Sequence, residues 1–156
     1  MAALFTSTYA VAPGKYLGAI AYDMLGKLWW LLLIPLIFFI AGVADWRWAV
    51  IGLMMLFLVY PALMTIALLS HGMRIEVIRR SSSRLASVDG NKITLYREII
   101  TGDIKDYQPV ETSEIVETYS RKDLTKIIIR SEGVDSPGFY DFVLIPTESY
   151  QMINPR

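Results

Sequence analysis

The chain has 156 residues, 54% of them hydrophobic, and no net charge at neutral pH. It has no cysteine and one histidine, His71, so disulfides, thiolate nucleophiles and the usual cysteine or multi-histidine metal sites are excluded. Neither half is basic enough to indicate nucleic-acid binding, and we expect no nucleic-acid partner, no metal and no cofactor. All but three of the 15 basic and two of the 15 acidic residues lie in 73–156. The sequence therefore divides into an apolar half and a half with the composition of a soluble domain.

Residues 1–27 form a short N-terminal arm. Pro13 suits the first position of a helix, because its fixed φ fits there and its missing N–H is not needed. Apolar side chains then recur at helical spacing up to Lys27: Tyr16, Leu17, Ile20, Met24 and Leu25. This pattern predicts an amphipathic helix on a bilayer surface, with an extension of the following span or a helix packed on the C-terminal domain as alternatives. Ser7–Val11 is a candidate for a short strand.

Two charge-free apolar runs, Leu28–Ala44 and Trp48–Ser70, follow the arm and are separated by Asp45–Arg47. A helix needs about 20 residues to cross a bilayer core. The second run exceeds this length and the first is slightly short of it. We therefore predict a transmembrane hairpin over residues 28–72. A signal peptide cleaved after Ala44 is the alternative, and the second span makes it the weaker one.

The tryptophans, prolines and glycines of the hairpin support further predictions. All four tryptophans lie near the ends of the runs, as interfacial anchors do; they are Trp29, Trp30, Trp46 and Trp48. Pro35 and Pro61 are expected to kink the spans, and Gly42 and Gly52 to let the helices approach closely. Neither span contains an ionisable residue, which argues against transport and for an anchor.

Basic residues flank the hairpin mostly on one side. Two precede the first span and four follow the second: Lys15, Lys27, Arg74, Arg79, Arg80 and Arg84. The positive-inside rule then predicts that both termini lie in the cytoplasm and the Asp45–Arg47 turn outside. The same six residues are candidates for contact with the membrane surface and its lipid headgroups, with a role in topology alone as the alternative. A role of His71 as a pH sensor is less favoured than simple interfacial placement.

Residues 73–156 change to short β-rich segments separated by turn residues. Asp89-Gly90-Asn91 is a hairpin signal, Thr101–Asp106 is expected to be a loop, and Thr147–Asn154 offers at most one or two helical turns. The expected strands are Arg74–Arg80, Arg84–Val88, Lys92–Ile100, Val110–Tyr119, Leu124–Arg130 and Phe139–Ile145. The predicted fold class is an α+β membrane protein, with a two-span helical hairpin followed by a small antiparallel β domain.

This layout resembles the YcxB-like bacterial membrane proteins, whose soluble part is similar to a pleckstrin-homology (PH)-like domain. Four segments carry the resemblance: Tyr9–Tyr16, Glu114–Thr118, Leu124–Ile129 and Leu144–Pro146. The sequence departs from the family at Thr112 or Ser113, where a tryptophan is usual, and in a shortened C-terminal helix. The resemblance implies a membrane-anchored module without enzymatic activity, in the bacterial inner (cytoplasmic) membrane, with a cytoplasmic PH-like domain over 73–156. It implies no catalytic or ligand residues.

Carboxylates recur at Glu111, Glu114 and Glu117. Paired carboxylates can serve acid–base chemistry, but no nucleophile, base or metal ligand accompanies them. We interpret them as a solvated charged strand edge, which would also discourage aggregation. We therefore expect no enzyme.

The favoured function is a binding or adaptor module, with an immunity protein as one form of it. Its expected partners are the lipid bilayer and either another protein or a second copy that associates through the hairpin. A small membrane-active oligomer of the holin kind is the alternative, and a membrane enzyme is a weaker one. A holin tail is usually disordered, whereas the strands expected in 73–156 predict a folded domain.

Overall fold

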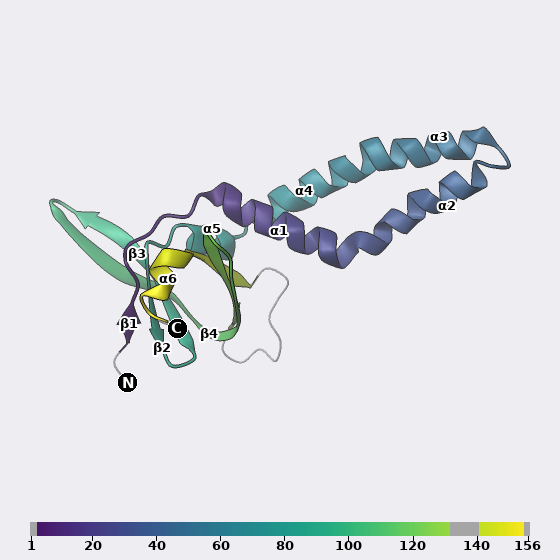
Figure 1. Ribbon diagram of the computed structural model, residues 1–156. Helices are drawn as coiled ribbons and strands as arrows, with labels where there is room; N and C mark the ends of the chain where they lie inside the picture. The colour runs from purple at the N-terminus through teal and green to yellow at the C-terminus, as the bar shows by residue number, and fades with distance from the viewer. Residues whose placement is uncertain (1–2, 132–140, 155–156) are drawn as a thin grey trace. The chain divides into compact units, whose positions relative to one another are not determined.

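The computed structural model describes residues 3–131 and 141–154. The chain forms two compact units, a helical one over residues 17–74 and a β-rich one over residues 1–16 and 75–156 (Figure 1). Two long apolar helices precede a six-stranded antiparallel sheet, so the α+β class expected from the sequence is confirmed.

Two helical runs are each long and apolar enough to cross a membrane, and the first of them begins in the β-rich unit. The first, Pro13–Ala41, joins α1 (Pro13–Leu28), the 3₁₀ segment η1 (Trp29–Leu32) and α2 (Leu33–Ala41). The second, Trp46–Gly72, joins α3 (Trp46–Met54), the π-helical segment η2 (Met55–Val59) and α4 (Tyr60–Gly72). Pro13 begins α1 as expected, and α1 runs on without a break into the first apolar run.

The turn between the two runs lies earlier than expected. It spans residues 42–45, and Trp46 already begins α3. The side chain of Asp45 accepts a hydrogen bond from the backbone N–H of Arg47 at 3.1 Å. An aspartate at this position satisfies one of the free N–H groups at a helix start. The expected bounds of the turn, Asp45–Arg47, were therefore wrong, because Asp45 caps α3 and Trp46 and Arg47 already belong to that helix.

Each proline interrupts the regular α-helix next to it. Pro35 has no N–H, so it cannot donate the hydrogen bond that an α-helix normally provides to the carbonyl four residues earlier, which is that of Leu31. The hydroxyl of Tyr60 donates a hydrogen bond to this carbonyl at 2.6 Å. The π-helical segment η2 directly precedes Tyr60 and Pro61. Tyr60 thus supplies this carbonyl with a donor that Pro35 lacks, and joins the two helices of the hairpin.

Two glycines allow these helices to approach closely, as expected. A Cβ atom on Gly42 would lie 2.6 Å from the Cβ of Ala49. A Cβ atom on Gly52 would lie 3.2 Å from the carbonyl oxygen of Pro35. Larger residues at these positions would force the helices apart.

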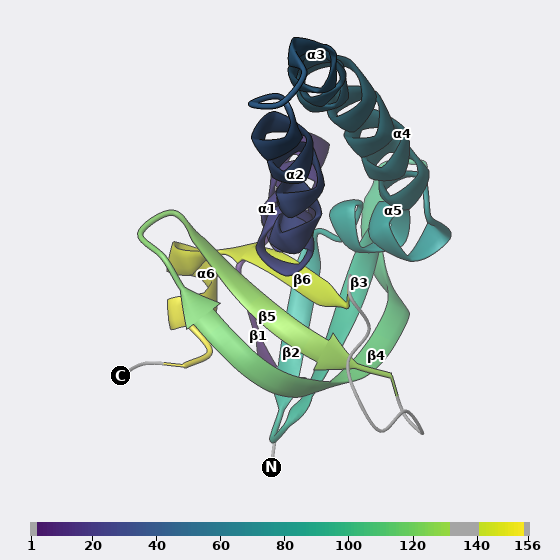
Figure 2. The ribbon, with the colours of Figure 1, turned by 90° about the vertical axis from the view of Figure 1, so that its right-hand side faces the viewer.

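The β-rich unit is one curled antiparallel sheet in which each strand pairs with its sequence neighbour (Figure 2). Its strands are β1 (Leu4–Phe5), β2 (Leu85–Asp89), β3 (Lys92–Thr101), β4 (Ile104–Ser120), β5 (Leu124–Arg130) and β6 (Phe142–Pro146). Short helices α5 (Ile75–Ser81) and α6 (Thr147–Gln151) complete it. The described strands confirm five of the six expected ones, although Phe139 and Tyr140 lie outside the described residues.

Two tight turns set the register of this sheet. Asp89 pairs with Lys92 around Gly90, which has φ of +58°, and Thr101 pairs with Ile104 around Gly102, which has φ of +65°. Glycine adopts this left-handed conformation without steric cost. The loop expected over Thr101–Asp106 was wrong, because two turn residues suffice and Ile104–Asp106 belong to β4.

The segment Arg74–Arg80 was also predicted wrongly, since α5 replaces the expected strand. Val77 and Arg80 are buried, whereas Ile75 and Ile78 are exposed. Side chains three residues apart share a face of a helix, so this division follows helical periodicity rather than strand alternation.

At the N-terminus, β1 lies before the expected strand Ser7–Val11. Residues that follow β1 still bond to the segment around β2. Thr6 N–H donates to the carbonyl of Ala86 at 2.9 Å, and Tyr9 N–H to that of Arg84 at 2.8 Å. The arm therefore contributes to the sheet unit, as the sequence suggested, but with a different strand.

The core lies inside the curl of the sheet. Alternate residues of β5 are buried, including Ile127 and Ile129, and four of the five residues of β6 are buried. Val143 and Ile145 on β6 are among the most buried side chains. β6 is thus a strand that is covered on both faces.

Candidate functional site

The six basic residues proposed as surface contacts occupy different environments. Lys15, Lys27, Arg74 and Arg79 are exposed, and Arg84 is half-buried. Arg80, at 3% exposure, is buried in the β-rich unit. A lipid-contact role for Arg80 does not fit this position, so we remove it from the candidate surface residues.

Arg80 projects from α5 into a cluster of carboxylates. Its Nε lies 3.0 Å from Oε2 of Glu111, and its Nη2 lies 2.7 Å from Oε1 of the same carboxylate. Its Nη1 donates to Oδ1 of Asp141 at 3.3 Å. The planar guanidinium suits such two-pronged contact with a carboxylate. α5, β4 and the start of β6 are thereby joined through one side chain.

Burial and charge act in opposite directions on this arginine. Burial alone would lower the pKa of Arg80, because it disfavours the charged form. The hydrogen bonds and negative charge of Glu111, and then those of Asp141, offset this effect and raise the pKa. Arg80 therefore stays charged, and the cluster holds the fold together rather than exchanging protons.

Two tyrosines of the N-terminal segment lie against the same region. The hydroxyl of Tyr16 contacts the carbonyl of Arg80 at 3.3 Å and accepts from the N–H of Leu144 at 3.1 Å. The hydroxyl of Tyr9 bonds with Oγ of Ser83 at 3.1 Å. Tyr16 was expected on the bilayer-facing side of an arm helix, but its hydroxyl is held inside the β-rich unit.

The carboxylates of β4 do not form a solvated edge. β4 is an interior strand between β3 and β5. Glu111 pairs with Arg80, Glu114 pairs with Arg130 at 2.5 Å, and Glu117 accepts from the hydroxyl of Tyr119. The Arg130 partner lowers the pKa of Glu114. The interpretation as a solvated charged strand edge was wrong, because β4 is an interior strand and because Glu111 and Glu114 pair with arginines of α5 and β5.

The most exposed part of the sheet is a two-stranded ribbon over residues 97–108, which we call the β3–β4 ribbon. β2 pairs with β3 only as far as Tyr96, and β5 pairs with β4 only from Glu114 onward. Among the described residues, no third strand pairs with the ribbon. Its outer backbone groups are therefore available, and Figure 1 shows the ribbon projecting from the sheet.

Apolar side chains lie near the tip of the β3–β4 ribbon. Ile100 is 67% exposed and Ile104 is 72% exposed. Lys105 and Glu98 form an ion pair across the strands at 3.0 Å. This surface was not predicted, because Thr101–Asp106 was expected to be a polar loop. The detectable signal was Gly102-Asp103, a two-residue turn flanked by residues able to form strands.

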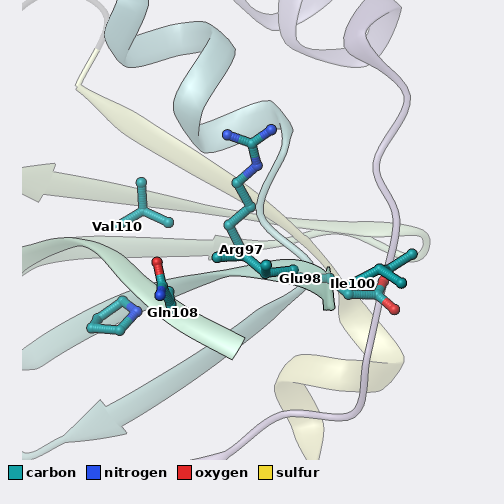
Figure 3. A pocket seen from close by; sticks show the side chains of 7 residues that line it. Arg97, Glu98, Ile100, Gln108 and Val110 are labelled. Carbon is teal, nitrogen blue, oxygen red and sulfur yellow. The ribbon is translucent and has the colours of Figure 1, made fainter. Parts of the chain in front are cut away.

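A hollow of about 520 Å³ lies at the base of the ribbon. Its lining residues are Arg97, Glu98, Ile99, Ile100, Gln108, Pro109 and Val110. Figure 3 shows Arg97, Gln108 and Val110 extending from the two paired strands. Val110 forms a bulge opposite Leu95 and Tyr96, next to Pro109. Proline lacks the N–H of a ladder, so it fits where β5 no longer pairs with β4.

The four tryptophans expected as interface anchors are all exposed. The ring of Trp48 also stacks on Phe38, with a centroid separation of 5.8 Å. Within residues 3–131 and 141–154, no group of three histidine, aspartate or glutamate side chains is placed to bind a metal. The surface features with the clearest geometry are therefore the ribbon and the basic and apolar side chains around α5.

Comparison with known proteins does not add an assignment. No protein-family model matches the chain, and neither a curated protein nor a solved structure matches it.

Proposed function

We propose that this protein is a membrane-anchored binding or adaptor module without enzymatic activity. In this proposal the helical hairpin holds the protein in the inner membrane of a bacterium. The β-rich unit is a PH-like domain that meets a partner in the cytoplasm. An immunity protein, which binds and neutralises a toxin, is one form that such a module takes.

The two apolar helical runs support the membrane placement. Each exceeds the length of about 20 residues that a bilayer core requires. Lys27 precedes the apolar part of the first run, and Arg74 and Arg79 follow the second. This charge distribution favours an orientation with both termini inside the cell.

The β3–β4 ribbon is the observation that carries the binding role. Free strand edges bind extended peptides by adding a strand, and neighbouring side chains then supply specificity. The ribbon has such edges, two exposed isoleucines and the hollow at its base. Its charged side chains, including Lys105 and Asp106, would limit uncontrolled edge-to-edge pairing. We therefore propose a protein partner with an extended segment.

Site-specific photo-crosslinking in native membranes tests this proposal. A crosslinking residue at position 104, on the ribbon, is compared with one at position 89, the exposed last residue of β2. We expect a discrete adduct with another protein from position 104 and none from position 89. Ile100→Asp, near the tip of the same ribbon, should abolish the adduct.

This experiment needs a control that shows the Ile100→Asp protein is correctly folded. Ile100 is exposed, so Ile100→Asp should change the free energy of unfolding by only about 0.5 kcal/mol. A correctly folded Ile100→Asp protein that still gives the full adduct would refute the ribbon as the binding surface. Equal adducts from positions 104 and 89 would refute it as well.

A further inference from the structure

Helix α5 has two chemically different faces. Val77 and Arg80 point into the β-rich unit, where Arg80 meets Glu111 and Asp141. Ile75 and Ile78 lie on the other side, with 69% and 53% exposure. At 100° per residue these two isoleucines lie about 60° apart, so they share a face. Figure 2 shows α5 as a short helix at one end of the sheet.

A positive charge borders the apolar face. Arg79 is exposed and lies about 40° from Ile75 around the helix axis. The one acidic residue of α5, Glu76, lies about 160° from Ile78. The exposed side therefore carries two isoleucines and a cation, and Glu76 lies beyond Arg79, about 60° from it and away from Ile78. Apolar side chains beside a cation are the combination that binds the headgroup region of an anionic leaflet.

The chain itself keeps α5 close to the end of an apolar helix. Gly72 is the last residue of the second run, and Ile75 begins α5 three residues later. Three residues span at most about 11 Å even when fully extended. If the second run crosses the bilayer, α5 cannot leave the boundary region of that leaflet. A helix of seven residues is too small to bind lipid strongly by itself. The second run holds α5 next to the leaflet, so weak contact is enough to keep it on the surface.

We propose that the Ile75–Ile78–Arg79 face of α5 seats in the interface of an anionic lipid leaflet. This inference rests on the membrane placement in the proposed function and assigns a second contact surface, separate from the ribbon. Because Arg80 on the opposite face is fixed to β4 and Asp141, seating α5 also orients the β-rich unit on the leaflet. The hairpin then lies within the bilayer, and the β-rich unit also contacts the bilayer surface through α5.

Fluorescence quenching by lipid-borne quenchers tests the seating. The chain has no cysteine, so single cysteines can be labelled without background. The full-length protein is labelled with an environment-sensitive dye at Ile78→Cys, or at Glu76→Cys as the control on the same helix. It is reconstituted into vesicles of phosphatidylcholine and phosphatidylglycerol that carry a quencher near the headgroups. We expect strong quenching at position 78 and little at position 76.

The contribution of the Arg79 charge to the binding of α5 to the leaflet is measured separately. Arg79→Gln should reduce the ratio of seated to unseated helix by about fivefold in vesicles containing phosphatidylglycerol, because one base near an anionic surface has about that effect. In pure phosphatidylcholine the same substitution should have no effect. An effect of equal size in both lipids, or in neither, would overturn the assignment of an anionic leaflet.

Other results would overturn the inference in distinguishable ways. Equal quenching at positions 76 and 78 would remove the oriented contact. Crosslinking of position 78 to another copy would show that a second chain, rather than lipid, covers the face. A label at Leu36→Cys, near the middle of the first apolar run, reports insertion independently in vesicles that carry the quencher within the lipid acyl chains. Quenching at position 36 without quenching at position 78 refutes the seating alone, whereas its absence at position 36 refutes the membrane placement itself.

Discussion

At the scale of single residues, Arg80 joins segments that are far apart in the sequence. Its guanidinium meets Glu111 on β4 and Asp141 next to β6. Removing one member of a buried ion pair leaves the other charge buried and uncompensated. The resulting loss of stability is larger than the net stabilisation that the intact pair provides. The side chain is therefore essential to the β-rich unit although it contributes little to any surface.

Arg80→Met is expected to lower the free energy of unfolding by about 3 kcal/mol, because Glu111 then lacks its partner. Arg79→Met, at the exposed neighbouring position, should change it by about 0.5 kcal/mol or less. Thermal unfolding in detergent, followed by the β-sheet circular dichroism signal, measures both. Equal effects of the two substitutions would show that the buried pair does not contribute as described.

Tyr9 makes stability depend on alkaline pH. Burial raises the pKa of Tyr9 to about 12, above its ordinary value of about 10, although the Ser83 hydrogen bond opposes this shift. The neutral hydroxyl is therefore favoured in the folded state. Its contribution is fully present below pH 10 and is lost as the pH rises from 10 to 12.

Tyr9→Phe should be less stable than the parent at pH 8, by about 1 kcal/mol, because the bond to Ser83 is lost. The difference should shrink above pH 10 and reverse before pH 12, because keeping the buried hydroxyl neutral then costs more than its hydrogen bond contributes. Unfolding free energies measured across this range test the prediction. A constant difference at every pH would mean that the Tyr9 hydroxyl does not titrate with folding.

At the scale of elements, the hairpin helices are joined by a hydrogen bond to a carbonyl whose usual α-helical donor position is a proline. Pro35 deprives the carbonyl of Leu31 of its helical donor, and Tyr60 supplies one from the other helix. In a bilayer no water is available to satisfy such a carbonyl. The kink positions and the helix pairing are therefore linked rather than independent features.

Tyr60→Phe is expected to destabilise the hairpin by about 1 kcal/mol, as is typical of hydrogen bonds between membrane helices. In a Pro35→Ala background the cost should be smaller, since the alanine N–H can bond to Leu31. A double-mutant cycle on unfolding in detergent measures this coupling. Additive effects of the two substitutions would exclude the proposed link.

Local sequence signals predicted most elements but not all of them, and contacts between distant residues were not predictable. Gly90 and Gly102 mark turns because each adopts a positive φ, but only the first was recognised. For Arg74–Arg80 the alternation suggested a strand, although a segment this short fits helical spacing equally well. The partners of Arg80 lie 31 and 61 residues away, beyond any local pattern.

At the scale of the whole molecule, the two units follow the division of charge along the chain, except that residues 1–16 belong to the β-rich unit. The charge-poor half forms the long apolar helices, and the charged half forms the curled sheet with its core on β5 and β6. The β3–β4 ribbon was not foreseen, because its exposed isoleucines are recognisable only once the register shows where β2 and β5 stop pairing. The proposed contact surfaces, the ribbon and α5, both lie outside the apolar half.

The central claim is that the hairpin spans the membrane and presents the β-rich unit to the cytoplasm. Labelling of single cysteines in intact cells by a membrane-impermeant maleimide tests it most directly. Ala44→Cys lies in the turn of the hairpin, and Lys122→Cys lies at an exposed position between β4 and β5. We predict that position 44 reacts in intact cells and position 122 only after lysis. Reaction of position 122 in intact cells, or of position 44 only after lysis, would contradict the account.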